Sequence, residues 1–304
     1  MLAVVLALAS AIGYGGSDFA AGLATRRASV IRVTLMSEAV SVAVVGVALA
    51  VIGGDPPSLQ AVAWGCVAGL AGVSGALALY VGFRHAAFSV SGPLSAVGAA
   101  GFSVLAGLLL GERPTAFALI GIVLALPAIV GVSASGRPGE HQQEGAPAGP
   151  RGRPAGPAGG RLWGRLPAGV SYGLIAGACF ALLFIGLNRA GSGSGLWPVF
   201  CGQATALATV ACAAAFTGDL RPPGTRGGWL AAAAGLIGAP ATILYFVATQ
   251  RGLLAIAAVI SSLYPAVTIM LARVLLGERL TAVRLAGLTL AAAAVTLIAI
   301  GGTG

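Results

Sequence analysis

The chain has 304 residues, of which 58% are hydrophobic and only 8% are charged, and its formal net charge is +9. A soluble domain carries roughly 25% charged residues because its surface must face water. The composition therefore excludes a soluble globular protein and predicts a multi-pass membrane protein. The positive charge, which would suggest nucleic-acid binding in a soluble protein, then belongs to loops and indicates membrane orientation instead.

The apolar segments, taken in chain order, predict ten transmembrane helices, since a helix needs about 20 residues to cross the hydrocarbon core. They lie at 2–24, 30–52, 61–83, 88–110, 115–134, 168–188, 196–217, 228–248, 253–276 and 281–300. Most connections are short, so neighbouring helices must run antiparallel. We expect an all-α protein of a cell membrane, either a bacterial inner membrane or a plasma membrane.

One connection is much longer than the others. Residues 135–167 are rich in Gly, Pro and Arg. They offer no apolar face to bury, so we predict a disordered linker. This linker separates five helices in residues 1–134 from five helices in residues 168–304.

The two halves look like copies of one another. Trp229 and Tyr245 follow Trp64 and Tyr80 by 165 residues, and the string Leu-Leu-Gly-Glu-Arg recurs after 166 residues. Such agreement predicts an internal duplication. Because each half has an odd number of helices, the second must enter the membrane from the side on which the first leaves. We therefore predict two inverted five-helix repeats, a plan that recurs among secondary transporters.

The repeats and two short motifs resemble a known family. Residues 14–21 read Tyr-Gly-Gly-Ser-Asp-Phe-Ala-Ala, and a Gly-Glu-Arg turn follows the fourth helix of each repeat. With ten helices, the chain resembles the EamA family of the drug/metabolite transporter superfamily. The resemblance implies transport of amino acids, metabolites, sugars or drugs, with both termini in the cytoplasm. Asp18 stands where the family more usually has Asn, and Leu23 stands near a position where it commonly has Lys.

The distribution of Arg indicates the opposite orientation. Eleven Arg residues fall in connections on the linker's side of the membrane, and three fall on the other side: Arg113, Arg189 and Arg251. Basic residues concentrate in cytoplasmic loops. The count therefore favours a cytoplasmic linker with both termini outside, and the orientation stays open between the two indications.

The repeated turn could be an active site, an ion site or a marker of the fold. Its two copies are Gly111-Glu112-Arg113 and Gly277-Glu278-Arg279. In inverted repeats they lie on opposite faces of the membrane and cannot form one shared site. Each Gly can end its helix in a left-handed cap, and Glu and Arg can pair with each other or with a neighbouring loop. We therefore favour a structural role.

Ionisable side chains inside the bilayer cost at least about 2.5–3.5 kcal/mol on insertion scales and need a reason. Glu38 lies well inside the second predicted helix and could bind a proton or pair with a cationic substrate. Its alternative is a structural role, either protonated or paired with Arg. Gln203 is its counterpart in the second repeat, an asymmetry that suits one charge-handling site lined by both repeats. Asp18 lies nearer a helix end, where we favour pairing with Arg26 or contact with water.

Tyrosines supply the remaining candidate positions. Tyr80 and Tyr245 occupy equivalent positions near helix ends, where we favour the interfacial aromatic belt over the lining of a cavity. Tyr264 follows Ser262 and precedes Pro265. A proline within a helix frees a backbone carbonyl, which can face a cavity, so this segment is a candidate for substrate binding.

Motifs of zinc proteases and of nucleotide-driven pumps are absent from the sequence. It has no HExxH and no Walker loop, so we predict neither an enzyme nor an ATP-driven pump, and no metal or cofactor. We predict a secondary transporter in the lipid bilayer that works by alternating access and exports a small metabolite, amino acid or drug-like solute. Proton coupling is a hypothesis, and a homodimer is an open alternative. A non-transporting membrane scaffold or receptor is the alternative function, and no nucleic acid is expected as a partner.

Overall fold

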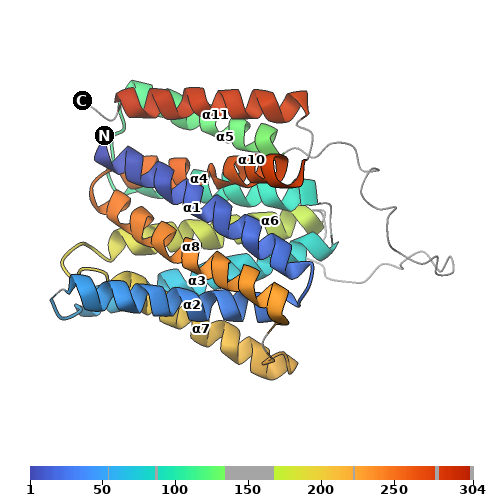
Figure 1. The fold of residues 1–304 in the computed structure, drawn as a ribbon. Helices are drawn as coiled ribbons and strands as arrows, with labels where there is room; N and C mark the ends of the chain where they lie inside the picture. The colour runs from blue at the N-terminus through green and yellow to red at the C-terminus, as the bar shows by residue number, and fades with distance from the viewer. Residues whose placement is uncertain (54, 86–87, 134–167, 222, 278–280, 302–304) are drawn as a thin grey trace, which may run out of the picture.

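The computed structural model describes residues 1–53, 55–85, 88–133, 168–221, 223–277 and 281–301, all of them helices and their connections (Figure 1). The predicted linker at 135–167 lies outside the described residues. The helices are α1 (Leu2–Thr25), α2 (Val30–Ile52), α3 (Leu59–His85), α4 (Phe88–Leu109), α5 (Ala116–Ser133), α6 (Ala168–Arg189), α7 (Trp197–Thr217), α8 (Thr225–Gln250), α9 (Leu254–Ser261), α10 (Tyr264–Leu276) and α11 (Ala282–Gly301).

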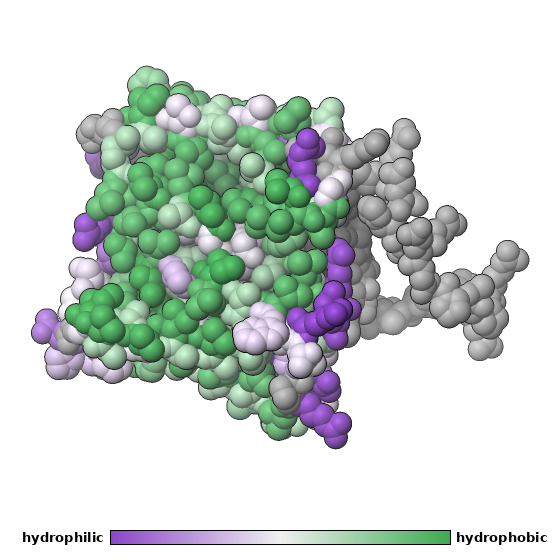
Figure 2. All heavy atoms as spheres, in the orientation of Figure 1, coloured by the Kyte–Doolittle hydropathy of each residue, from purple (hydrophilic) through white to green (hydrophobic). Residues whose placement is uncertain are grey.

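The helices have the length and composition of membrane spans. Eight described segments are long and apolar enough to cross a bilayer, and two shorter apolar helices, Leu94–Leu109 and Ala116–Val132, accompany them. Figure 2 shows a broad hydrophobic band on the visible face, with hydrophilic residues gathered towards the two ends of the helices. Large apolar side chains such as Val47 and Phe216 are exposed, as is expected of a surface that faces lipid. The protein is a multi-pass membrane protein.

The predicted helix at 253–276 differs from the structure, which divides it into α9 and α10 at Ser262 and Leu263. Pro265 explains the break, because it has no N–H to donate to the carbonyl of Ser261 and its ring excludes a helical carbonyl there. The chain resumes as a new helix with Pro265 in its first turn, a position that tolerates proline. The two pieces together still have the length of one membrane span.

The contact between α5 and α11 is symmetric. Gly121 of α5 packs against Ala294 and Ile298 of α11, and Gly287 of α11 packs against the backbone at Ala128 and Val132 of α5. Each residue in the first contact lies 166 positions from its counterpart in the second, the offset of the repeated turn. The two helices therefore run antiparallel and meet through equivalent residues.

The other contacts between the two halves also occur as equivalent pairs. Helix α1 packs on α8 as α6 packs on α3, and α2 packs on α8 as α7 packs on α3. Helix α4 packs on α6 as α9 and α10 pack on α1. Several of these crossings are backbone against backbone: a Cβ on Gly69 of α3 would collide with the carbonyl oxygen of Gly202 of α7. Small residues permit such close approach, which dispersion contacts then stabilise.

An ion pair ties α2 to the connection between α7 and α8. The guanidinium of Arg32 lies 2.6 Å from a carboxylate oxygen of Asp219, and the hydroxyl of Ser29 donates to the other carboxylate oxygen at 2.6 Å. The pKa of Asp219 is below its ordinary value, chiefly because Ser29 donates a hydrogen bond to the carboxylate and further because Arg32 donates and carries positive charge. This contact holds the start of α2 beside the end of α7.

Candidate functional site

A cavity of about 690 Å³ lies between helices of both halves. Its lining residues come from α1, α2, α3, α4, α6, α7, α8, α10 and α11. At one end it reaches Thr25 and Arg26, where α1 ends, together with Leu276 and Arg284, where α10 ends and α11 begins. The cavity therefore opens on the face that carries the α1–α2 connection. Its volume lies within the range of roughly 300–1,000 Å³ that is typical of small-molecule sites.

Two acidic side chains line this cavity at a similar depth. Ser17 donates its hydroxyl hydrogen to the carbonyl of Ala234 at 2.8 Å, and Ser41 donates to the carbonyl of Gly235 at 3.3 Å. Asp18 follows Ser17 on α1, and Glu38 lies one helical turn before Ser41 on α2. Both therefore flank the same turn of α8, and both line the cavity.

Neither acid is neutralised by a cation within the described part of the chain. The Oε2 atom of Glu38 is shielded from solvent and has no hydrogen-bond partner among the described residues. Asp18 is exposed to the cavity, and Arg26 lines the same cavity. The two form no ion pair among the described residues, in contrast to Arg32 and Asp219. The pairing of Asp18 with Arg26 that the sequence suggested is not seen.

Of the other candidate positions, Gln203 and Tyr264 line the cavity, whereas Ser262 does not. Ser262 is fully buried in the break between α9 and α10, and its hydroxyl has no partner among the described residues. The structure thus brings Gln203 of α7 and Tyr264 of α10 to the same cavity as the two acids. It leaves Ser262 behind this lining.

Tyr245 lies inside the bundle and not in the interfacial belt that the sequence favoured. It is fully buried, its ring stacks on Phe184 with 4.4 Å between the ring centroids, and its hydroxyl donates to the carbonyl of Phe184 at 3.3 Å. Phe184 lines the cavity and Tyr245 does not. The stacked pair therefore closes the cavity at depth. The side chain of Tyr80, the counterpart of Tyr245, lies outside the described residues.

A polar contact between α6 and α8 continues this closure towards the opposite face. The amide of Asn188 donates to the hydroxyl oxygen of Thr249 at 2.8 Å and to its carbonyl at 3.1 Å. The amide of Gln250 donates to the carbonyls of Leu187 and Asn188, both at 3.0 Å. A second hollow of about 590 Å³ lies on that face, and it shares no lining residue with the first cavity.

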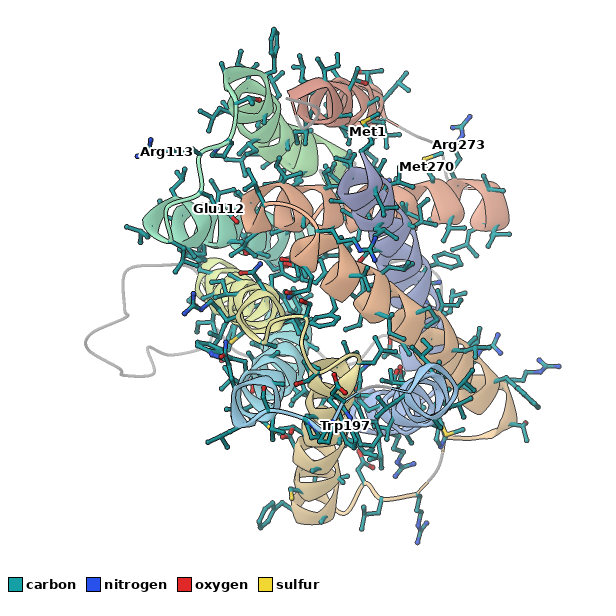
Figure 3. The ribbon with its side chains drawn as sticks, turned by 90° about the vertical axis from the view of Figure 1, so that its left-hand side faces the viewer. Met1, Glu112, Arg113, Trp197, Met270 and Arg273 are labelled. Carbon is teal, nitrogen blue, oxygen red and sulfur yellow. The ribbon has the colours of Figure 1, made fainter. Side chains whose placement is uncertain are left out.

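The first copy of the repeated turn caps a helix. The carboxylate of Glu112 accepts hydrogen bonds from the backbone N–H groups of Leu254 at 2.5 Å and Ala255 at 2.9 Å, at the start of α9. Gly111, at φ +89°, has the left-handed backbone that turns the chain after α4. Arg113 is exposed, and Figure 3 shows it directed away from the bundle while Glu112 is directed into it.

The second copy is described only at its glycine. Gly277, at φ +69°, ends α10 in a left-handed cap, and its N–H donates to the carbonyl of Arg273. Glu278 and Arg279 lie outside the described residues.

No group of three or more His, Cys, Asp or Glu suited to a metal ion occurs among the described residues. The four Cys are free thiols.

Sequence reasoning did not single out several residues that shape the site. The hydroxyl of Tyr14 donates to Thr242 at 3.2 Å, and both line the cavity. Phe180 and Thr268 line it as well. A signal existed for Tyr14, which opens the motif at 14–21. None existed for Thr242 or Phe180, because apolar and hydroxyl side chains on a membrane helix give no sign of which neighbour they face.

Comparison with known proteins gives a family and a fold. Residues 1–134 and 167–300 match the family described as "EamA-like transporter family". A search of the curated proteins finds no match. One solved structure, described only as "Crystal structure of protein", superposes with a TM-score of 0.68, covering 96% of this chain and 98% of its own at 17% sequence identity. At that identity the likeness concerns the fold alone.

Proposed function

The chain belongs to the EamA-like transporter family, and from this premise we propose that it is a secondary transporter that exports a small solute. The observation that carries the proposal is the cavity, which is lined by both halves, opens on one face and ends inside the bundle at the Phe184–Tyr245 stack. A cavity that reaches the middle of the bilayer from one side is what a carrier needs in one of its two end states.

We propose that the halves are inverted repeats that alternate access. The antiparallel packing of α5 on α11 supports this, because Gly121 and Gly287 make equivalent contacts with the opposite helix. Such contacts are expected when a pseudo-two-fold axis relates the two helices. Rocking one repeat against the other would close the face that is now open and open the face that is now closed. The solute would stay between the repeats while its access changes sides.

The charge of the open face supports the proposed direction of transport. Arg26 and Arg284 lie at the mouth of the cavity. Arg27 and Arg221 belong to connections at the same ends of the helices, and Arg226 lies in the first turn of α8. By the positive-inside rule this face is cytoplasmic, so the structure is open to the compartment from which an exporter loads.

This orientation predicts the place of the chain's last residue. A reporter enzyme that is active only outside the cytoplasm, fused after Gly304, should be active in intact cells. The same reporter inserted after Arg27 should be inactive. Activity of the Arg27 insertion with silence of the Gly304 fusion would reverse both the orientation and the direction of transport proposed here.

Flux tests the function itself. Purified protein reconstituted into liposomes should accelerate the efflux of solutes from a mixed metabolite pool, compared with protein-free liposomes, and a pH gradient should drive accumulation. A membrane scaffold or receptor would bind without flux. Absence of flux for every solute, in liposomes where the protein is folded, would favour that alternative.

Glu38→Gln should uncouple transport from the proton gradient. Oε2 of Glu38 has no partner among the described residues and is the candidate proton carrier. With one proton per solute, a pH difference of one unit is worth about 1.4 kcal/mol and supports roughly tenfold accumulation. The variant should lose this accumulation and retain exchange of labelled for unlabelled solute at saturating solute concentrations. Asp55→Asn, at an exposed acid between α2 and α3, serves as the control. Full gradient-driven accumulation by the Glu38 variant would remove Glu38 from the coupling.

A further inference from the structure

The charges in the cavity are not distributed evenly. Asp18 and Glu38 flank the turn of α8 at Ala234–Gly235, whereas Arg26 lies where α1 ends and Arg284 lies near the start of α11. Negative charge therefore belongs to the interior and positive charge to the mouth. The other titratable groups in the lining are Tyr14 and Tyr264.

Two carboxyl groups in one apolar cavity need compensation. Oε2 of Glu38 is shielded from solvent, and burying a carboxylate without a partner is costly, so Glu38 either takes up a proton or binds a cation. Asp18 is exposed to the same cavity and adds a second acid to its lining. Neither Asp18 nor Glu38 has an ion pair within the described residues, and Oε2 of Glu38 has no hydrogen-bond donor there either. A proton or cation that neutralises Glu38 must therefore come from the cavity.

The remaining lining selects what carries the positive charge. Phe180 and Phe184 of α6 and Phe19 of α1 line the same cavity, and its exposed surface is mostly apolar. Aromatic rings attract organic cations through their faces and bury the apolar body of a ligand. A small inorganic ion would leave this surface unused. A ligand with an apolar or aromatic body and one positive charge would use both parts of the cavity.

Resting on the proposed transport function, we propose that the substrate is a monocationic organic amine whose ammonium group binds between Asp18 and Glu38, with its apolar body against the aromatic residues of α6. Binding of the amine displaces a proton from this carboxyl pair, so amine and proton compete for one site. The stoichiometry closes as one ammonium bound for one proton released. The protein is then an amine–proton exchanger, which loads the amine where the cavity is now open.

Three probes with the same body separate this substrate class from its neighbours. Phenethylamine carries only the ammonium, phenylalanine carries an ammonium and a carboxylate, and hydrocinnamate carries only the carboxylate. Titration calorimetry on the full-length protein in detergent should show phenethylamine binding at least about tenfold more tightly than the other two, a difference of about 1.4 kcal/mol. The binding heat should change with the ionisation enthalpy of the buffer, because a proton is released.

Variants of the two acids test the assignment. Asp18→Asn and Glu38→Gln should each weaken phenethylamine binding at least about tenfold and reduce the released proton, while Glu38→Asp should retain binding and Asp55→Asn should leave it unchanged. A thermal unfolding midpoint near that of the parent protein establishes that each variant is folded. Tighter binding of phenylalanine would assign a zwitterion that uses Arg26 or Arg284. Undiminished amine binding in the Asp18→Asn/Glu38→Gln double variant would overturn the proposal outright.

The substrate class and the transport function fail in different ways. Amine binding without flux in proteoliposomes would leave the binding site standing and would remove the transport function. Flux of an anionic or zwitterionic solute without amine binding would support the transport function and would remove the amine site.

Discussion

Replacing Glu112 by alanine should destabilise the protein by about 2–6 kcal/mol, because it leaves two buried donors without an acceptor and each costs about 1–3 kcal/mol. The Glu112 carboxylate accepts from the N–H groups of Leu254 and Ala255, and both of these residues are fully buried. A helix leaves its first N–H groups without partners inside the helix, so the carboxylate is the acceptor that these two groups need. The thermal unfolding midpoint in detergent measures the loss.

Two further variants separate the cap from general effects of charge. Glu112→Gln keeps an acceptor oxygen and loses the charge that favours a helix N-terminus. Its unfolding midpoint should therefore fall between those of the parent protein and Glu112→Ala. Arg113→Ala removes the neighbouring charge, which is exposed, and should change stability by no more than about 0.5 kcal/mol. Equal midpoints for Glu112→Ala and Arg113→Ala would show that the cap contributes nothing.

The second large effect is expected at Gly287. Adding a single methyl group there, in Gly287→Ala, would drive a Cβ into the backbone N of Val132 and the carbonyl carbon of Gly131. Backbone atoms of a packed helix cannot swing aside as a flexible side chain can, so α5 and α11 must separate. Overpacking of this kind costs about 1–3 kcal/mol, which outweighs the gain of about 0.8–1.0 kcal/mol that alanine brings to a helix interior.

The matched control is Gly101→Ala in α4. A Cβ at Gly101 meets nothing within 4 Å, so the same substitution should leave the unfolding midpoint unchanged or raise it slightly. Equal midpoints for the two variants would mean that the α5–α11 contact is looser than the structure shows. Because Gly287 does not line the cavity, amine binding by any folded fraction of the variant should be unaffected.

Composition was sufficient to predict the membrane spans, because the lipid core requires about 20 apolar residues of every helix that crosses it. Twenty apolar residues in a row cannot be anything else in such a chain. The break at Ser262 could not be predicted from Pro265 alone, since Pro127 in α5 and Pro240 in α8 lie within continuous helices. Whether proline breaks a membrane helix depends on what the neighbours offer to the freed backbone groups.

The sequence could indicate single residues of the site, but not which of them come together in space. Burial cost alone singled out Glu38. The partners of Glu112 lie 142 and 143 residues further along the chain, and no spacing rule reaches so far. Asp18 was judged by its distance from a helix end, whereas its position is set by the hydrogen bond of Ser17 to α8. Such relations exist only after the helices have packed.

The amide contacts of Asn188 and Gln250 have no equivalent in the first repeat. The positions 165 residues earlier than Asn188, Thr249 and Gln250 hold Leu23, Arg84 and His85. In the proposed cycle these three would have to meet when the other face closes, and they offer no amide group to form such hydrogen bonds. On the proposed cycle we therefore expect the empty protein to favour the state in which its arginine-rich face is open, and the occupant of the cavity, amine or proton, to stabilise the other state.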